Sequence, residues 1–302
     1  MSKFWLWDFY WNNRETRRSP ENYAAFVRKC AADSEMPRLR ENAQQAGPYP
    51  EGPDNGWRYK FGRLPVHDRL LKACKLDEIA GQGDTFTRAL RLMGWLCAHT
   101  WYSGASFWSA RFSNSYFQGK RIDSMRILRF AFDKPFSHSI NCGHVGYLLA
   151  DCLLAAGFSA IPVTMKNYIY HAGGEKTKGV PNHTVVHLWL PEERRWVMLD
   201  PSLDSYISGS DGRALNLAEI YERRGGDDLR VARYSLNGTQ ECREEYLGYF
   251  ILGSLLEIMV EDGACRDGSL RNRLLPGGVP LKGEKVRAIT IAELLAEPIL
   301  KE

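Results

Sequence analysis

The chain has 302 residues and a formal net charge of +4, and 44% of its residues are hydrophobic and 12% aromatic. This length and hydrophobic content are sufficient for one large domain, or for a core with extensions. No apolar run approaches the roughly 20 residues needed to cross a bilayer. Basic residues are interspersed with acidic ones, so we expect no membrane or nucleic-acid partner.

The amino terminus and the cysteines both bear on the cellular compartment. The first residues, Met-Ser-Lys-Phe-Trp-Leu-Trp-Asp-Phe-Tyr-Trp, lack the apolar segment and the small-residue cleavage site of a signal peptide. The seven cysteines are an odd number without patterned spacing, which fits a reducing compartment. We therefore expect a cytoplasmic protein.

The amino-terminal part predicts one helix, near Glu21–Ala32, and a loop rich in Pro, Gly and Asn over Ala46–Gly56. The loop is typical of a domain boundary or of an ordered crossing of the surface. An aromatic cluster precedes both and is expected to pack this segment onto the body of the protein, because buried aromatic side chains dominate cores. The cluster consists of Trp5, Trp7, Tyr10 and Trp11.

An amphipathic helix is predicted to begin at Cys142. Apolar residues recur with the period of a helix at Val145, Leu148, Leu149, Cys152, Leu153 and Ala156. Asn141 is a suitable N-cap residue, and Gly157 is a suitable left-handed stop. Cys142 is then the first helical residue and lies on the apolar face. The unpaired amides and the dipole of a first helical turn favour a thiolate, so Cys142 is a candidate nucleophile.

Two strand-like runs follow, His183–Leu190 and Trp196–Asp200, and they predict a hairpin. A four-residue loop pairs Leu190 with Arg195 and places Asp200 diagonal to His183 on the same face of the sheet. A five-residue loop without a bulge would put Asp200 on the other face. With the even register, a thiol, an imidazole and a carboxylate form the parts of a nucleophile, a base and an orienting group.

His183 and His187 also have the i, i+4 spacing of a helical zinc site. The intervening Thr-Val-Val favours a strand, on which residues four apart are separated by roughly 13 Å, too far to share one metal. No C-x-x-C pair is present. Metal-dependent hydrolysis is therefore the weaker alternative, and we expect no cofactor.

The carboxy-terminal part predicts three further segments: a helix over Leu215–Arg224, a longer helix over Glu241–Glu261, and a short strand with a closing helix over Lys285–Glu302. The longer helix carries apolar residues that must be buried. Two placements are open. It either covers the cleft and influences substrate choice, or it supports the back of the sheet.

The three motifs together resemble the transglutaminase-like superfamily of papain-like cysteine enzymes. They are N-C-x(14)-G from Asn141, N-H-T-x-x-H from Asn182, and W-V-x-L-D-P-S from Trp196. The segment Asp84–Tyr102 is similar to the helix that precedes the catalytic helix in that family. One departure is His187, which stands where the family commonly has an acidic residue.

The resemblance implies an α+β fold in which the Cys142 helix packs against an antiparallel sheet, with Cys142, His183 and Asp200 as catalytic residues. It divides the chain into an amino-terminal extension (1–83), a catalytic core (84–206) and a carboxy-terminal helical extension (207–302). The implied activity is acyl transfer or amide hydrolysis on a peptide, amide or thioester. The Cys142 amide is the expected oxyanion donor, with Trp95, Tyr102 or Trp108 as candidate side-chain partners. A catalytically silent binding module on the same fold is the alternative.

Overall fold

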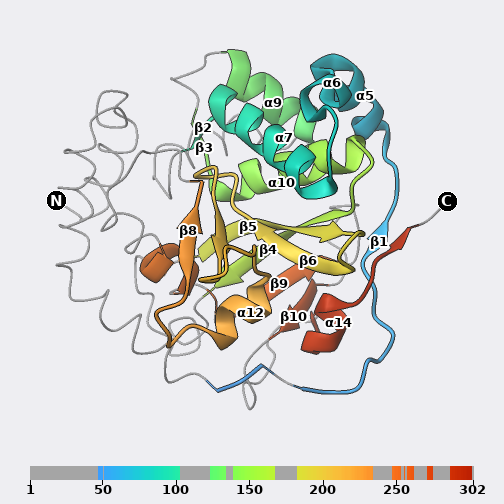
Figure 1. Ribbon diagram of the computed structural model, residues 1–302. Helices are drawn as coiled ribbons and strands as arrows, with labels where there is room; N and C mark the ends of the chain where they lie inside the picture. The colour runs from blue at the N-terminus through green and yellow to red at the C-terminus, as the bar shows by residue number, and fades with distance from the viewer. Residues whose placement is uncertain are drawn as a thin grey trace, which may run out of the picture.

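The computed structural model describes residues 47–49, 51–102, 123–133, 139–166, 182–233, 247–252, 255, 257–261, 271–274 and 286–300. It shows the expected α+β class: a group of helices covers one side of a sheet, and shorter helices lie on the other side (Figure 1). The aromatic cluster at residues 5–11, the helix predicted near Glu21–Ala32, and Trp108 lie outside the described residues.

The main sheet has six strands in the order β11-β10-β9-β4-β5-β6. All neighbouring pairs are antiparallel except β10 and β11, which are parallel. The two hairpin strands of the candidate site therefore lie at one edge. The strands are β4 (Ala160–Lys166), β5 (Asn182–Leu190), β6 (Arg195–Leu199), β9 (Glu257–Glu261), β10 (Arg271–Leu274) and β11 (Val286–Ala288).

One helix, α10 (Cys142–Ala155), forms the centre of the helical layer. It packs on β4 and β5 and contacts three further helices of that layer, and its apolar side chains Leu148, Leu149 and Leu153 are fully buried. The layer comprises α5 (Pro65–Cys74), α6 (Leu76–Ala80), α7 (Thr85–His99), α9 (Ser124–Asp133) and α10.

Both ends of α10 are fixed as the sequence predicts. The Asn141 side chain accepts a hydrogen bond of 2.9 Å from the His144 amide, which caps the first turn. At the other end Gly157 has φ +86°. The Gly157 and Phe158 amides donate to the carbonyls of Leu154 and Leu153, the pairing of a Schellman motif.

A buried polar cluster fixes the middle of α10. Asp151 accepts a hydrogen bond from the Ser124 hydroxyl on α9 and lies 3.5 Å from Nε2 of His67 on α5. The other ring nitrogen of His67 accepts from the Leu64 amide at 3.1 Å, so the ring proton lies on the Asp151 side. Three helices are thereby joined through one carboxylate.

The helix predicted over Glu241–Glu261 is wrong for its last part, Glu257–Glu261. Leu247–Leu252 forms a short π-helix, η1, and Glu257–Glu261 is strand β9. Ile258 and Val260 are buried while β9 pairs with β4 on one side and β10 on the other. Two partner strands and a β-branched, alternately buried sequence outweigh the helical spacing.

The other predicted elements that fall on described residues are confirmed, and some are shorter than predicted. The segment Asp84–Tyr102 forms α7 and then β2 (Trp101–Tyr102), which pairs with β3 (Ser139–Ile140). The carboxy-terminal segments form α12, β11 and α14, and also a strand that was not predicted, β12. The remaining small elements are β1 (Lys60–Phe61), β7 (Tyr206–Ser208), β8 (Arg230–Ala232), α12 (Leu217–Glu222), α14 (Ile291–Leu295) and β12 (Ile299–Leu300).

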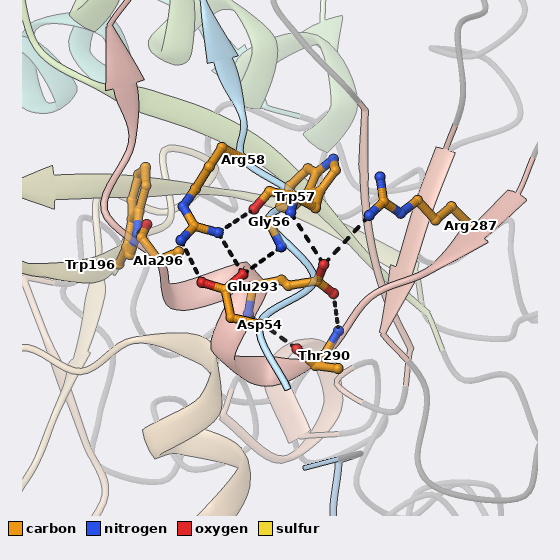
Figure 2. A network of polar contacts seen from close by, with 9 residues as sticks. All are labelled: Asp54, Gly56, Trp57, Arg58, Trp196, Arg287, Thr290, Glu293 and Ala296. Carbon is orange, nitrogen blue, oxygen red and sulfur yellow. Dashed lines mark hydrogen bonds and ion pairs between the residues drawn. The ribbon is translucent and has the colours of Figure 1, made fainter. Parts of the chain in front are cut away.

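Residues 51–61 cross the surface to meet the end of the chain, where β1 pairs with β12. Figure 2 shows the polar contacts at this junction. The buried carboxylate of Glu293 accepts from the Trp57 amide at 3.3 Å and from the Thr290 amide at 2.9 Å, and lies 3.5 Å from Arg287. The indole of Trp196 on β6 donates to the Ala296 carbonyl at 3.0 Å. Residues 51–61 and the segment that follows β11 are thus attached to the sheet.

The Glu293 carboxylate gives a stability prediction. Glu293→Ala removes the side-chain acceptor of the buried Trp57 amide and the Glu293 half of the capping box of α14, so the free energy of unfolding should fall by about 2–3 kcal/mol. Denaturant unfolding measures this loss. Glu297→Ala is the matched control: its carboxylate forms an exposed ion pair with Arg194, and its loss should change stability by less than about 0.5 kcal/mol. Equal effects of the two substitutions would contradict the role given to Glu293.

Candidate active site

Cys142 occupies the first position of α10, directly after the Asn141 cap. The residue as a whole is half-buried. The amides of a first helical turn have no acceptor within the helix and point out of its end. The thiol therefore lies beside backbone N–H groups that favour negative charge.

The hairpin has the predicted register. A four-residue turn over Pro191–Arg194 joins β5 to β6, and the pairs run from Leu190 with Arg195 to Val186 with Leu199. Extending the register by one step places Asp200 opposite Val185. Since side chains alternate along a strand, Asp200 then shares the face of His183.

The structure brings Asp200 and His183 into direct contact. The Nε2 atom of His183 lies 2.6 Å from Oδ2 of Asp200. The two side chains are 1% and 0% exposed, so water does not compete for this hydrogen bond. Since Nε2 faces the carboxylate, Nδ1 is the nitrogen on the other side of the ring.

The thiol of Cys142 interacts with the same imidazole. Burial raises the pKa of Cys142, but the His183 imidazole and the Thr184 amide lower it, and the net shift is downward. Burial lowers the pKa of His183, but Asp200 and the thiolate raise it, to about 10. The opposite shifts favour a thiolate–imidazolium pair. By contrast, burial raises the pKa of Cys152 in the middle of α10.

A glycine allows α10 to approach β5 closely enough for this pair to form. A Cβ atom at Gly146 would lie 2.9 Å from Cγ2 of Thr184 and 3.5 Å from the Thr184 carbonyl. Thr184 is buried and β-branched, and its hydroxyl lies 3.3 Å from that of Thr164 on β4. The strand side chain therefore has little freedom to move aside. Gly146 was not among the site residues predicted from the sequence, although a glycine inside a helical pattern is a known signal of close packing.

His187 is placed away from the thiol and has a structural role. Its ring is fully buried and lies parallel to Trp196, with ring centroids 6.0 Å apart. Its Nε2 atom accepts a 3.2 Å hydrogen bond from the amide of Leu217, the first residue of α12. Burial lowers the pKa of His187 to about 3, so the ring is neutral. A carboxylate could accept the same bond, but it would bring charge into the core.

Of the side-chain candidates for an oxyanion donor, Trp95 has described ring contacts. Trp95 packs against His99 and Phe132, with ring centroids 5.5 and 6.0 Å away, which is a packing role. Tyr102 lies in β2, next to the strand that precedes Cys142. The Cys142 amide stays the predicted donor.

Within the described ranges, no three His, Cys, Asp or Glu side chains gather in a way that could hold a metal ion. Among the same residues, no helix combines the length and the apolar character needed to cross a membrane. Comparison with known proteins gives no family model, no curated protein and no solved structure that matches the chain.

The contact at Gly146 can be tested by adding one methyl group. Gly146→Ala should push α10 from β5 and reduce Cys142 alkylation near pH 6, and overpacking should cost about 1–3 kcal/mol of stability, offset by a helix-propensity gain of about 1 kcal/mol. The double variant Gly146→Ala/Thr184→Ser removes the clashing Cγ2 atom and keeps the hydroxyl. It should recover most of the alkylation rate. A single variant as reactive as the parent protein would disprove the role of this contact.

His187 gives a prediction about acid stability. Its folded pKa, about 3, lies below the unfolded value near 6.5. Its contribution to stability is therefore complete above pH 6.5 and is lost as pH falls toward 3. His187→Gln retains an acceptor for the Leu217 amide but does not titrate. The stability of the parent protein minus that of the variant should fall by about 1.4 kcal/mol per pH unit between pH 6 and 4. A constant difference in urea unfolding would contradict a neutral, buried His187.

Proposed function

We propose that this protein is a cysteine-dependent acyl-transfer or amide-hydrolysing enzyme, similar to the transglutaminase-like and papain-like cysteine enzymes. Cys142 is the nucleophile, His183 the general base and acid, and Asp200 the group that orients His183. The observation that carries the proposal is the buried His183 ring, which contacts Asp200 through Nε2 and interacts with the thiol of Cys142.

The chemistry follows from the charge on each group. The Cys142 thiolate attacks the carbonyl carbon of a peptide, amide or thioester and forms a tetrahedral intermediate. As this intermediate collapses, protonated His183 gives its proton to the leaving amine or thiol, and an acyl-thioester on Cys142 remains. Water or an acceptor amine then attacks the thioester while neutral His183 takes the proton from it. The acyl product leaves, and the thiolate–imidazolium pair is restored.

Asp200 serves two purposes in this scheme. Its hydrogen bond holds the ring with Nε2 away from the thiol, so Nδ1 is the atom that exchanges the proton. Its negative charge also stabilises the imidazolium form, which raises the pKa of His183. The negative charge on the intermediate would be met by the Cys142 amide at the start of α10, where the helix dipole adds to the hydrogen bond.

The half-buried position of Cys142 supports an enzyme over a silent binding module. A cysteine with only a packing role is usually inert and has no lowered pKa. Cys142 combines partial exposure with a lowered pKa, whereas Cys152 on the same helix is buried and has a raised pKa. The substrate class proposed is a peptide, amide or thioester in the cytoplasm, with hydrolysis and transfer both open to the same intermediate.

A labelling and trapping experiment tests this function. Limited iodoacetamide treatment near pH 6 should modify Cys142 before Cys152 and the other cysteines, because the pKa of Cys142 is lowered whereas burial raises the pKa values of Cys74 and Cys152. Incubation with a library of peptides and acyl-thioesters should then give an acyl adduct on Cys142 in intact-mass spectra.

Variants separate the two histidines in the same experiment. His183→Ala should reduce turnover by about two orders of magnitude or more, the usual effect of removing a general base. His187→Gln should retain measurable turnover and serves as the matched control. If Cys142 reacts no faster than a model thiol, the nucleophile is wrongly assigned. A reactive Cys142 that accepts no acyl group would favour the binding module.

A further inference from the structure

The loop that carries Asp200 determines where its carboxylate points. Asp200 and Ser205 exchange two backbone hydrogen bonds of 2.8 and 3.0 Å, which close the loop just after β6. The Ser202 amide donates to Oδ1 of Asp200 at 2.9 Å, leaving Oδ2 for His183. A change in the shape of this loop would therefore change the contact between Asp200 and the imidazole.

An ion pair holds the far side of this loop. Both oxygens of Asp204 accept from the Arg233 guanidinium, at 3.0 and 3.1 Å. Arg233 directly follows β8, while Asp204 has a left-handed backbone with φ +50°, which is uncommon for a residue other than glycine. The Asp204 side chain is 18% exposed and that of Arg233 is 36% exposed. The pair thus attaches a strained position of the loop to a neighbouring strand.

Helix α7 provides the space for this ion pair. A Cβ atom at Gly94 would lie 2.7 Å from Nη2 of Arg233 and 3.8 Å from Oδ1 of Asp204. Glycine is unfavourable inside a helix, so its place here is explained by the guanidinium that occupies the space. Three residues further along the same helix, the Cys97 thiol lies 2.8 Å from the Pro201 carbonyl. One side of α7 therefore contacts both ends of the loop.

We propose that Arg233, seated against Gly94 and paired with Asp204, is a positioning residue that keeps Asp200 directed at His183. This inference rests on the proposed function, because it assigns Arg233 a purpose in the Cys142–His183–Asp200 site. Arg233 touches none of these three side chains directly. Arg233 acts through the loop between Asp200 and Ser205. The effect of removing Arg233 is measured as a change in the acidity of the Cys142 thiol.

The exposure of the Arg233 side of the ion pair, 36%, makes this role separable from simple stabilisation. Partly exposed ion pairs contribute little to the stability of a fold. The contact between Asp200 and His183, in contrast, depends on a short hydrogen bond in a buried setting, where a small displacement has a large electrostatic effect. Removing Arg233 should therefore leave the protein folded and weaken the imidazolium, which raises the pKa of Cys142.

The test is the rate of Cys142 alkylation by iodoacetamide as a function of pH in the full chain. For Arg233→Met, the rate near pH 6 should fall about three- to tenfold, while the rate near pH 9.5, where the thiol is ionised in either case, should change less than about twofold. Arg233→Lys should recover part of the loss. Gly94→Ala should reproduce it, although this substitution favours the helix. Arg230→Met is the matched control, since Arg230 donates to the Asp227 and Leu229 carbonyls.

The possible outcomes are distinct. If Arg233→Met alters both rates equally, or neither, the positioning role is overturned. If Arg233→Met fails to fold, the pH profile of Arg233→Lys decides: a shifted profile supports the role and an unchanged one overturns it. If the Cys142 thiol of the parent protein has an ordinary pKa, both the proposed function and this inference are wrong.

Discussion

The site depends on how closely helix α10 lies against strand β5. At Gly146 the helix has no side chain, and Thr184 fills the space that a Cβ atom would need. This contact, together with the Asn141 cap and the buried Asp151 cluster, fixes the height and direction of the helix end that carries Cys142. The half-buried Cys142 and the buried His183, 41 residues apart in sequence, are thereby held together. The electrostatics of the pair follow from that packing.

Local patterns were sufficient to predict the parts of the structure that local chemistry controls. Asn141 and Gly157 mark both ends of α10, and the four-residue turn sets the hairpin register that joins His183 to Asp200. The role of His187 could not be predicted, because its partner is the amide of Leu217, thirty residues away. The close packing at Gly146 could not be predicted for the same reason, because its partner Thr184 lies on a different element, strand β5.

Strand β9 shows where sequence periodicity fails. Leu255 and Met259 have the i, i+4 spacing of a helix, yet Ile258 and Val260, two residues apart, are buried on one face of a strand between β4 and β10. The strand structure of this segment is decided by its two neighbouring strands. β10 follows β9 in the sequence, but β4 lies far before it. The carboxy-terminal part thus completes the main sheet, and its last residues meet the segment 51–61 at Glu293 (Figure 2).

The pairing of β1 with β12 has a consequence for the order of folding. Lys60 pairs with Ile299, and β4 gains its second neighbour, β9, only when Glu257–Glu261 has been synthesised. Both contacts close very large loops of chain. Contacts of such long sequence separation slow folding, and their edges stay exposed until the closing segments are available. During synthesis the hairpin β5–β6 and helix α10 emerge well before these segments. The nascent chain must therefore carry an incomplete sheet, with β4 open along one edge, until Glu257–Glu261 has been synthesised.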